Sequence, residues 1–279
     1  MKKLSLLALS YVFFLTACDS GGGSKTPVPE SEQAYCLSGD VSSIVEGRKV
    51  ESYDNDRVNA IMLIILGNDD KIYFCTASAI SNKVLLTAAH CVDDARAIKV
   101  AYKTSAYCSS GFDFRYDSVN AQSFAKHPDY VAKSYTNTNA DVGLVLLKNS
   151  IPSPYKVFAI NQSPESVNSD LYLYGYGITR GYNDDSGLLR KTSVDHSDYH
   201  YDDKTIVVDR NGDGGICQGD SGGPGMIKVN SEFQIAGVTS YGRGTKYDVC
   251  SGTGHLVLAY KYLPWIKSKM SAWGQYLND

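Results

Sequence analysis

The chain has 279 residues, 43% of them hydrophobic and 20% charged, and its formal net charge is -3 at pH 7. This length and apolar content suffice for one large domain or two small ones with a sizeable core. The small net charge and the lack of a long basic run disfavour nucleic acid and anionic membrane surfaces as partners, so we expect a protein or peptide partner.

The N-terminus has the pattern of an export signal. A positively charged start precedes an apolar run, residues 4–15, that is too short to span a bilayer comfortably. The run ends in Leu-Thr-Ala-Cys, which resembles a bacterial lipobox whose cysteine, Cys18, is lipidated and becomes the first mature residue. We therefore predict a signal peptide at residues 1–17 and an envelope lipoprotein, periplasmic or on the outer surface, held to a membrane by lipid on Cys18. Ordinary secretion with cleavage near Ala17 and an uncleaved anchor are the alternatives.

A tether and six cysteines follow. Residues 20–30 read SGGGSKTPVPE, which is the composition of a solvated linker. The chain has seven cysteines, and setting Cys18 aside leaves six, which suits three disulfides in an oxidising compartment. The sequence by itself leaves their pairing open.

After the tether, short apolar or β-branched runs alternate with turn-forming residues, which is the pattern of strands. The runs lie within residues 60–75, 83–91, 141–150, 170–177, 205–215 and 233–242. A division near residues 152–162 would give two β halves of similar size.

The tail differs from the rest of the chain because it has helical periodicity. From Pro264 onward one apolar stripe is formed by Trp265, Ile266, Met270 and Trp273. We predict a mostly β protein that closes with one helix.

His90 lies in the stretch LLTAAHCV, directly after an apolar run typical of a buried strand and before Cys91. A disulfide between Cys91 and Cys75, near the previous strand, would fix the loop that carries His90. Taken alone, His90 is more simply interpreted as a structural residue, and its neighbouring motifs reverse that interpretation.

The stretch DRNGDGGICQGDSGGP, residues 209–224, fits two chemistries. Its first half imitates the ligand spacing of an EF-hand calcium loop, with Asp209, Asn211, Asp213, Gly214 and finally Asp220. Its second half, GDSGGP, is typical of the setting of a nucleophilic serine, Ser221. An EF-hand also needs flanking helices, whereas the flanks TIVV and GMIKV read as strands. We therefore favour the serine site and expect no metal or cofactor; a weak ion held by Asp209, Asn211 and Asp213 alone is the alternative to a plain polar turn.

Three motifs together resemble the trypsin-like serine proteases of the chymotrypsin fold. They are TAAHC at 87–91, ADVGLVLL at 140–147 and GDSGGP at 219–224, and they follow the family's order of His, Asp and Ser. The resemblance implies an all-β fold of two six-stranded antiparallel Greek-key β-barrels packed together, with a C-terminal α-helix.

The implied domain limits follow from the same resemblance, which begins at residue 44. A lipidated tether and propeptide-like segment precedes it. The limits are 18–43 for that segment, 44–158 for the N-terminal barrel, 159–263 for the C-terminal barrel, and 264–279 for the helix and tail.

The resemblance assigns catalytic roles to His90, Asp141 and Ser221. A serine hydroxyl is a poor nucleophile at neutral pH, so a base must remove its proton, and His90 would serve as that base. Asp141 would hold the imidazole tautomer and stabilise the imidazolium, while the backbone N–H groups of Gly219 and Ser221 would form the oxyanion hole. The implied function is a serine endopeptidase; a catalytically silent envelope binding protein on the same fold is the alternative.

The resemblance also implies an activation step. Ile44 begins the stretch IVEG, similar to the family's IVGG, and Asp220 would pair with the amine that cleavage before Ile44 creates. Asp220 would then be unavailable to a calcium loop. The preceding residue is Ser43, where the family usually has a basic residue, so we expect a different activating protease; an uncut chain is the alternative.

Family spacing pairs Cys217 with Cys250, which would brace the specificity pocket. With Cys75 and Cys91 already paired, this leaves Cys36 and Cys108. That disulfide would keep the segment before Ile44, and its lipid, attached after activation.

The resemblance locates the substrate-binding residues as well. Gly215 would form the base of the S1 pocket and Gly242 and Gly254 its walls, while Ser240, Tyr241 and Gly242 would bind the substrate backbone by strand addition. An open, uncharged pocket favours cleavage after large apolar or aromatic residues. The alternative, cleavage after lysine or arginine, requires Asp213 or Asp248 to reach the pocket.

Overall fold

The computed structural model describes residues 36–38, 48–132, 140–179, 185–209, 215–244 and 250–277. Several predictions concern residues outside these ranges. They are the predictions for the export signal and tether, for Cys18 and Ile44, and for Asp213 and Asp248. Among the described residues, no helix is both long and apolar enough to cross a membrane.

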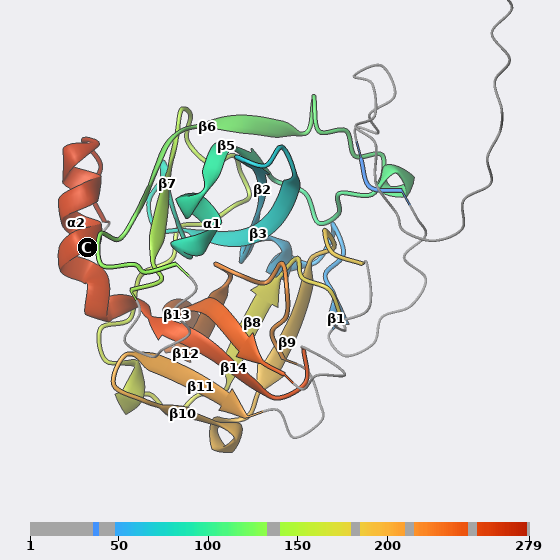
Figure 1. Ribbon diagram of the computed structural model, residues 1–279. Helices are drawn as coiled ribbons and strands as arrows, with labels where there is room; N and C mark the ends of the chain where they lie inside the picture. Colours follow the sequence, from blue (N-terminus) through green and yellow to red (C-terminus); the bar gives the residue numbers. More distant parts are fainter. Residues whose placement is uncertain are drawn as a thin grey trace, which may run out of the picture. The chain divides into compact units, whose positions relative to one another are not determined.

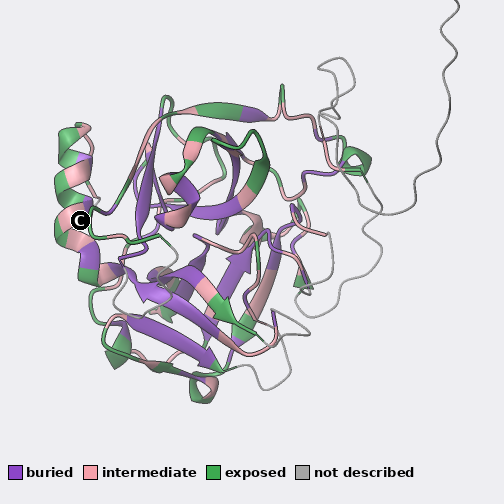
Figure 2. Cartoon of the chain, viewed as in Figure 1, coloured by how far each residue is buried: buried purple, intermediate pink, exposed green. Residues whose placement is uncertain are grey.

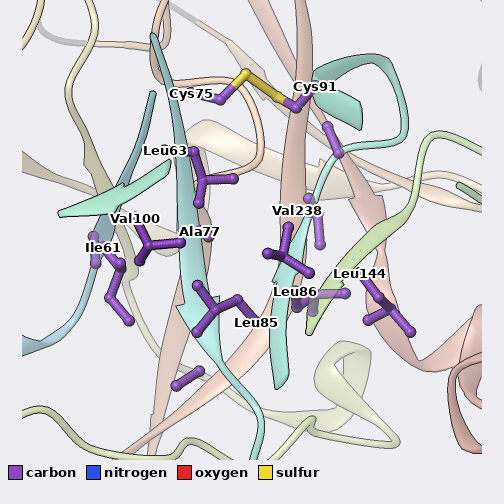
Figure 3. Packing of buried hydrophobic residues seen from close by; sticks show 14 of the residues in the cluster. Ile61, Leu63, Cys75, Ala77, Leu85, Leu86, Cys91, Val100, Leu144 and Val238 are labelled. Carbon is purple, nitrogen blue, oxygen red and sulfur yellow. A yellow bond between two sulfur atoms is a disulfide. The ribbon is translucent and has the colours of Figure 1, made fainter. Parts of the chain in front are cut away.

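Six antiparallel strands close into a barrel, as the sequence predicted for the first half (Figure 1). Apolar residues occupy nearly every position of its central strands, and their side chains, such as Leu63, Leu85 and Leu144, pack together in the interior (Figure 3). The strands pair in the order β2-β3-β4-β7-β6-β5. Their bounds are β2 Ile61–Gly67, β3 Ile72–Ala79, β4 Val84–Thr87, β5 Ala95–Ala101, β6 Ser118–Lys126 and β7 Gly143–Leu147.

The second half differs in detail from the closed barrel that we expected. It is an eight-stranded antiparallel sheet in the order β1-β9-β8-β12-β13-β14-β11-β10. The bounds are β1 Arg48–Lys49, β8 Leu171–Gly175, β9 Arg190–Val194, β10 Tyr199–Tyr201, β11 Thr205–Asp209, β12 Pro224–Val229, β13 Glu232–Arg243 and β14 Thr253–Leu258.

Between its two edge strands, β1 and β10, the sheet has six central strands, which begin with β9 and end with β11. In the described part of the chain, β9 and β11 do not pair with each other, so the sheet does not close into a barrel. The outer edge of β9 instead pairs with β1 at Arg190 and Lys191, and the outer edge of β11 pairs with β10. Strand β1 lies in the segment that the sequence assigned to the first barrel, yet it extends the second sheet.

The helices are short, and the longest is the predicted C-terminal one. Helix α2 spans Leu263–Ala272 with Pro264 in its first turn, where proline is well tolerated. Its stripe is buried at Ile266 and Met270, while its other face is exposed (Figure 2). The remaining described helices are α1 His90–Asp93 and the 3-10 turns η1 Asn55–Val58, η2 Cys108–Ser110, η3 Pro164–Ser166, η4 His196–Asp198 and η5 Ala259–Tyr262.

Disulfides join three pairs of cysteines among the described residues. They are Cys36–Cys108, Cys75–Cys91 and Cys217–Cys250, the same pairs at which the sequence analysis arrived. The second joins β3 to α1 beside the buried cluster (Figure 3).

Candidate active site

His90 and Asp141 meet because of the pairing of β4 with β7. In this antiparallel pair Thr87 lies opposite Gly143, so the residues after β4 and before β7 emerge at the same end of the barrel. Gly143 allows the approach, because a Cβ there would lie 2.7 Å from the carbonyl oxygen of Ala88. The Nδ1 atom of His90 lies 2.8 Å from Oδ2 of Asp141, and the backbone N–H of His90 donates to Oδ1 at 2.9 Å.

Asp141 is an ionised acceptor in a buried place, with 3% of its surface exposed. Ser240 donates its hydroxyl hydrogen to the same Oδ2. Burial acts to raise the pKa of Asp141, but the charge of His90 and the hydrogen bonds from His90 and Ser240 outweigh it, so the pKa lies below its ordinary value. Because a carboxylate only accepts, Nδ1 of His90 is the donor in this contact.

Ser221 lines the same pocket as His90, together with Gly219 and the disulfide formed by Cys75 and Cys91. Its backbone is held from the barrel, because the N–H of Thr76 in β3 donates to the carbonyl of Ser221 at 2.8 Å. The hydroxyl-bearing Ser221 and the imidazole of His90 therefore line one pocket at the junction of the barrel and the second sheet.

The sulfur atoms of this pocket do not form a metal centre. The ligand atoms of Cys75, His90 and Cys91 lie within 4.8 Å of one another. However, the two sulfurs are bonded to each other and are not thiolates, the form in which cysteine binds zinc.

Glycines are required around Ser221 by close backbone packing. Gly222 has φ +80°, and a Cβ there would lie 2.0 Å from Oγ1 of Thr87. Gly219 has φ +99°, and a Cβ there would lie 2.8 Å from Cα of Gly177. The left-handed conformation and the lack of space both exclude a side chain.

The backbone N–H groups of this loop divide into two sets. Those of Asp220, Gly222 and Gly223 donate to carbonyl oxygens. Those of Gly219 and Ser221 donate to no acceptor in the described part of the chain. Two unpaired donors beside a serine hydroxyl are what stabilisation of a developing oxyanion requires.

The carboxylate of Asp220 accepts hydrogen bonds from two backbone N–H groups. Its Oδ1 accepts the N–H of Gly177 and its Oδ2 accepts the N–H of Cys217, each at 2.8 Å. Gly175 makes room for the carboxylate, since a Cβ at Gly175 would lie 2.0 Å from Oδ1. Asp209, the first residue of the calcium-like stretch, lies 3.6 Å from Nδ1 of His200.

Comparison with known families adds an independent observation. The family model described as Trypsin matches residues 44–266. This chain belongs to the trypsin family.

The similar proteins of known function agree with this membership. Chymotrypsin-like elastase family member 1 from Canis lupus familiaris is 24% identical over 80% of this chain and 91% of its own length. The Homo sapiens protein of that name is 26% identical over 80% of this chain and 91% of its own. Phenoloxidase-activating enzyme 1 from Spodoptera litura is 27% identical, over 72% of this chain and 60% of its own.

A solved structure supports the fold. The HL collagenase structure aligns with a TM-score of 0.64 at 23% identity, covering 82% of this chain and 99% of that one. As a member of the trypsin family, the chain is a serine endopeptidase, and its substrates are proteins or peptides.

Two of the predicted specificity residues of this trypsin-family enzyme are neighbours, and a residue that was not predicted packs against one of them. Gly242 in β13 pairs with Gly254 in β14. A Cβ at Gly254 would lie 2.7 Å from Cγ1 of Ile216, a residue that is only 4% exposed and follows Gly215. Ile216 therefore packs against Gly254, one of the two predicted wall positions, where we expected an open side. The sequence signal was the single apolar residue between Gly215 and Cys217.

A second residue that sequence reasoning missed is His255 in β14, which lies opposite the predicted substrate strand. Ser240 and Tyr241 lie in β13, where the pairing with β14 is irregular between Thr239 and Tyr241. The ring of Tyr241 stacks on the imidazole of His255, with centroids 4.4 Å apart and planes at 11°. No motif marks His255, because the contact depends on strand register.

Proposed function

We propose that this endopeptidase cleaves peptide bonds through an acyl-enzyme formed on Ser221, with His90 and Asp141 completing the triad. The observation that carries the proposal is the pairing of His90 Nδ1 with the buried Asp141, on a histidine that shares a pocket with Ser221. This pairing orients the imidazole and fixes the tautomer that a general base needs.

The steps follow from these positions. Nε2 of His90 takes the hydroxyl proton as Oγ of Ser221 attacks the scissile carbonyl carbon. The N–H groups of Gly219 and Ser221 then bond the oxyanion. When the C–N bond breaks, His90 returns the proton to the leaving amine. Water, deprotonated by His90, attacks the ester and releases the carboxylic acid product, and Ser221 regains its proton.

Labelling by a fluorophosphonate tests this mechanism. We expect the activated enzyme to be phosphonylated at Ser221 and to hydrolyse a denatured protein. Ser221→Ala should abolish both reactions, whereas Ser163→Ala, a change at a serine outside the pocket, should affect neither. Full hydrolysis by folded Ser221→Ala would refute the serine mechanism, and an intact chain without labelling or hydrolysis would favour the silent binding protein.

We propose a preference for large apolar side chains at P1. Gly215 brings no charge to the predicted base of the pocket, and the neighbouring Ile216, which packs against Gly254, is apolar as well. Burying an unpaired lysine or arginine head there would cost several kcal/mol, whereas burying an apolar side chain gains roughly 1.5 to 3 kcal/mol. A peptide library decides between the readings: dominant cleavage after basic residues, abolished by Asp213→Ala, would contradict this preference.

Activation and anchoring are proposed together. Cleavage between Ser43 and Ile44 would free an amine for Asp220, and the Cys36–Cys108 disulfide would retain the preceding segment with its lipid on Cys18. Three disulfides are consistent with an exported, extracellular location. Mass spectrometry of the envelope protein tests both steps: we expect a modified Cys18 as the first residue and, after activation, a second N-terminus at Ile44. Any other mature N-terminus would contradict the corresponding step.

A further inference from the structure

His255 stacks against Tyr241, a residue of the predicted substrate strand β13. It lies opposite Tyr241 in the pairing of β14 with β13, and the two rings are stacked in parallel. The histidine is 8% exposed. Its Nε2 lies 3.1 Å from Oγ1 of Thr253, whereas its Nδ1 has no hydrogen-bond partner among the described residues.

Charged and titratable groups face this histidine from three strands. On β13, the guanidinium of Arg243 lies 5.7 Å from the centroid of the Tyr241 ring. Asp209 on β11 is paired with His200 on β10, and Asp202 follows β10. Burial, and then the charge of Arg243, lower the pKa of His255 below its ordinary value, while Asp202 and Asp209 act in the opposite direction.

The two protonation states of His255 differ in how well they fit this place. A neutral imidazole stacks on the phenol ring and leaves one nitrogen as an unused acceptor, which costs little beside the cost of a buried charge. An imidazolium has two N–H donors and a positive charge, but among the described residues only Thr253 is within hydrogen-bond reach, and the charge of Arg243 repels the imidazolium. Its attraction for the ring face is weaker than the cost of burying an unpaired charge. Protonation therefore favours movement of His255 away from Tyr241.

We propose that His255 is a positioning residue that holds Tyr241 for binding of the substrate backbone, so that acid weakens peptide binding by releasing this support. The proposal rests on the proposed function, in which Ser240, Tyr241 and Gly242 bind the substrate by strand addition. It predicts a pH dependence of peptide affinity that is separate from the titration of His90 as the catalytic base.

Equilibrium binding in the full-length Ser221→Ala chain isolates this effect, because no bond is cleaved. The probe is a capped hexapeptide of alanine and glycine with one phenylalanine, which has no titratable group. Its Kd is measured between pH 8 and pH 5. We expect Kd to rise about threefold to tenfold as the pH falls, which corresponds to the usual strength of an aromatic pair.

Two variants of the Ser221→Ala chain separate the effect of charge on His255 from the effect of its stacking on Tyr241. His255→Phe keeps a flat ring under Tyr241 but cannot be protonated, so its Kd should lose the extra pH dependence. His255→Leu lacks the ring, so its Kd should be higher at every pH. Like His255→Phe, it should lack the extra pH dependence, because it has no imidazole to protonate. His90 is present in all three proteins, and its contribution cancels in the comparison.

The outcomes distinguish this inference from the proposed function. Identical pH profiles for the parent and His255→Phe would overturn the inference, even if the enzyme with Ser221 intact hydrolyses peptides normally. Failure of that intact enzyme to react with a fluorophosphonate would instead overturn the proposed mechanism. Circular dichroism at each pH shows that the variants are folded.

Discussion

Ser240 donates its hydroxyl hydrogen to Oδ2 of Asp141, the same oxygen that lies 2.8 Å from Nδ1 of His90. The strand predicted to bind substrate is thereby joined directly to the carboxylate that orients the predicted base. One buried atom, Oδ2 of Asp141, therefore contacts both the predicted substrate strand and the imidazole of His90.

This shared contact predicts unequal effects of two substitutions. Asp141→Asn should lower kcat by about 10⁴-fold, because an amide no longer fixes the required tautomer. Ser240→Ala should lower kcat by roughly 10-fold to 150-fold, which corresponds to one hydrogen bond to a charged group. Steady-state kinetics, corrected for active enzyme, measure both. Equal losses would show that Ser240 does more than support Asp141.

Gly219→Ala should lower kcat by roughly 100-fold to 1000-fold, the usual effect of losing one oxyanion donor. The new Cβ would lie 2.8 Å from Cα of Gly177, so the loop must move. Gly274→Ala is the matched control, since Gly274 also has positive φ, at +66°, but no atom within 4 Å of its Cβ position. Both variants should lose stability in thermal unfolding, and only the first should lose activity. Normal kcat in Gly219→Ala would remove Gly219 from the oxyanion hole.

The contact between Gly254 and Ile216 predicts a rescue. Gly254→Ala should lower kcat/KM on substrates with phenylalanine at P1, because its Cβ would meet Cγ1 of Ile216 at 2.7 Å and press it into the pocket. Ile216→Ala should restore part of that activity in the double variant. A peptide series that varies only at P1 makes the measurement. Strictly additive losses would show that the two residues act independently.

Acid should destabilise the fold through two buried histidines. Burial lowers the pKa of His127 and of His255 below the ordinary value of 6.5. The unfolded chain therefore takes up protons first, and the free energy of unfolding falls as the pH drops through 6.5 toward the folded pKa values. The lowered pKa of Asp141 affects the free energy of unfolding only at lower pH, where its carboxylate becomes protonated. Urea unfolding of Ser221→Ala, which cannot digest itself, should show a shallower decline between pH 7 and pH 5 after His127→Phe and His255→Phe.

Two disulfides should differ in their effect on activity. Removing Cys75–Cys91 should cost about 3 kcal/mol of stability and reduce kcat, because α1 begins at His90, next to Cys91. Removing Cys36–Cys108, which closes a longer loop with a separation of 72 residues, should cost about 4 kcal/mol but leave kcat largely intact. In each variant both cysteines of one disulfide are replaced by alanine. Unfolding measures the loss of stability, and kinetics at 20 °C below the Tm of each variant measure kcat. An equal fall in kcat in the two variants would contradict this prediction.

Several features were readable in the sequence because they depend on neighbouring residues. The apolar runs predicted the barrel strands, and the stripe of Ile266 and Met270 predicted α2. The motifs around His90, Asp141 and Ser221 carried the resemblance to the trypsin family, which the match over residues 44–266 supports. The Cys75–Cys91 pair was inferred from the loop that carries His90, and the other two pairs followed from the resemblance and from the cysteines that remained.

Only the tertiary structure decided which distant residues meet. Sequence periodicity did not indicate that β1 and β10 would cover the sheet edges, leaving the second half open. It also did not show that Ile216 would pack on Gly254, that Ser240 would bond Asp141, or that His255 would stack under Tyr241. The physical reason is register: the alternation along one strand determines which residues share a face, but the residue opposite is set by pairing between segments far apart in the chain.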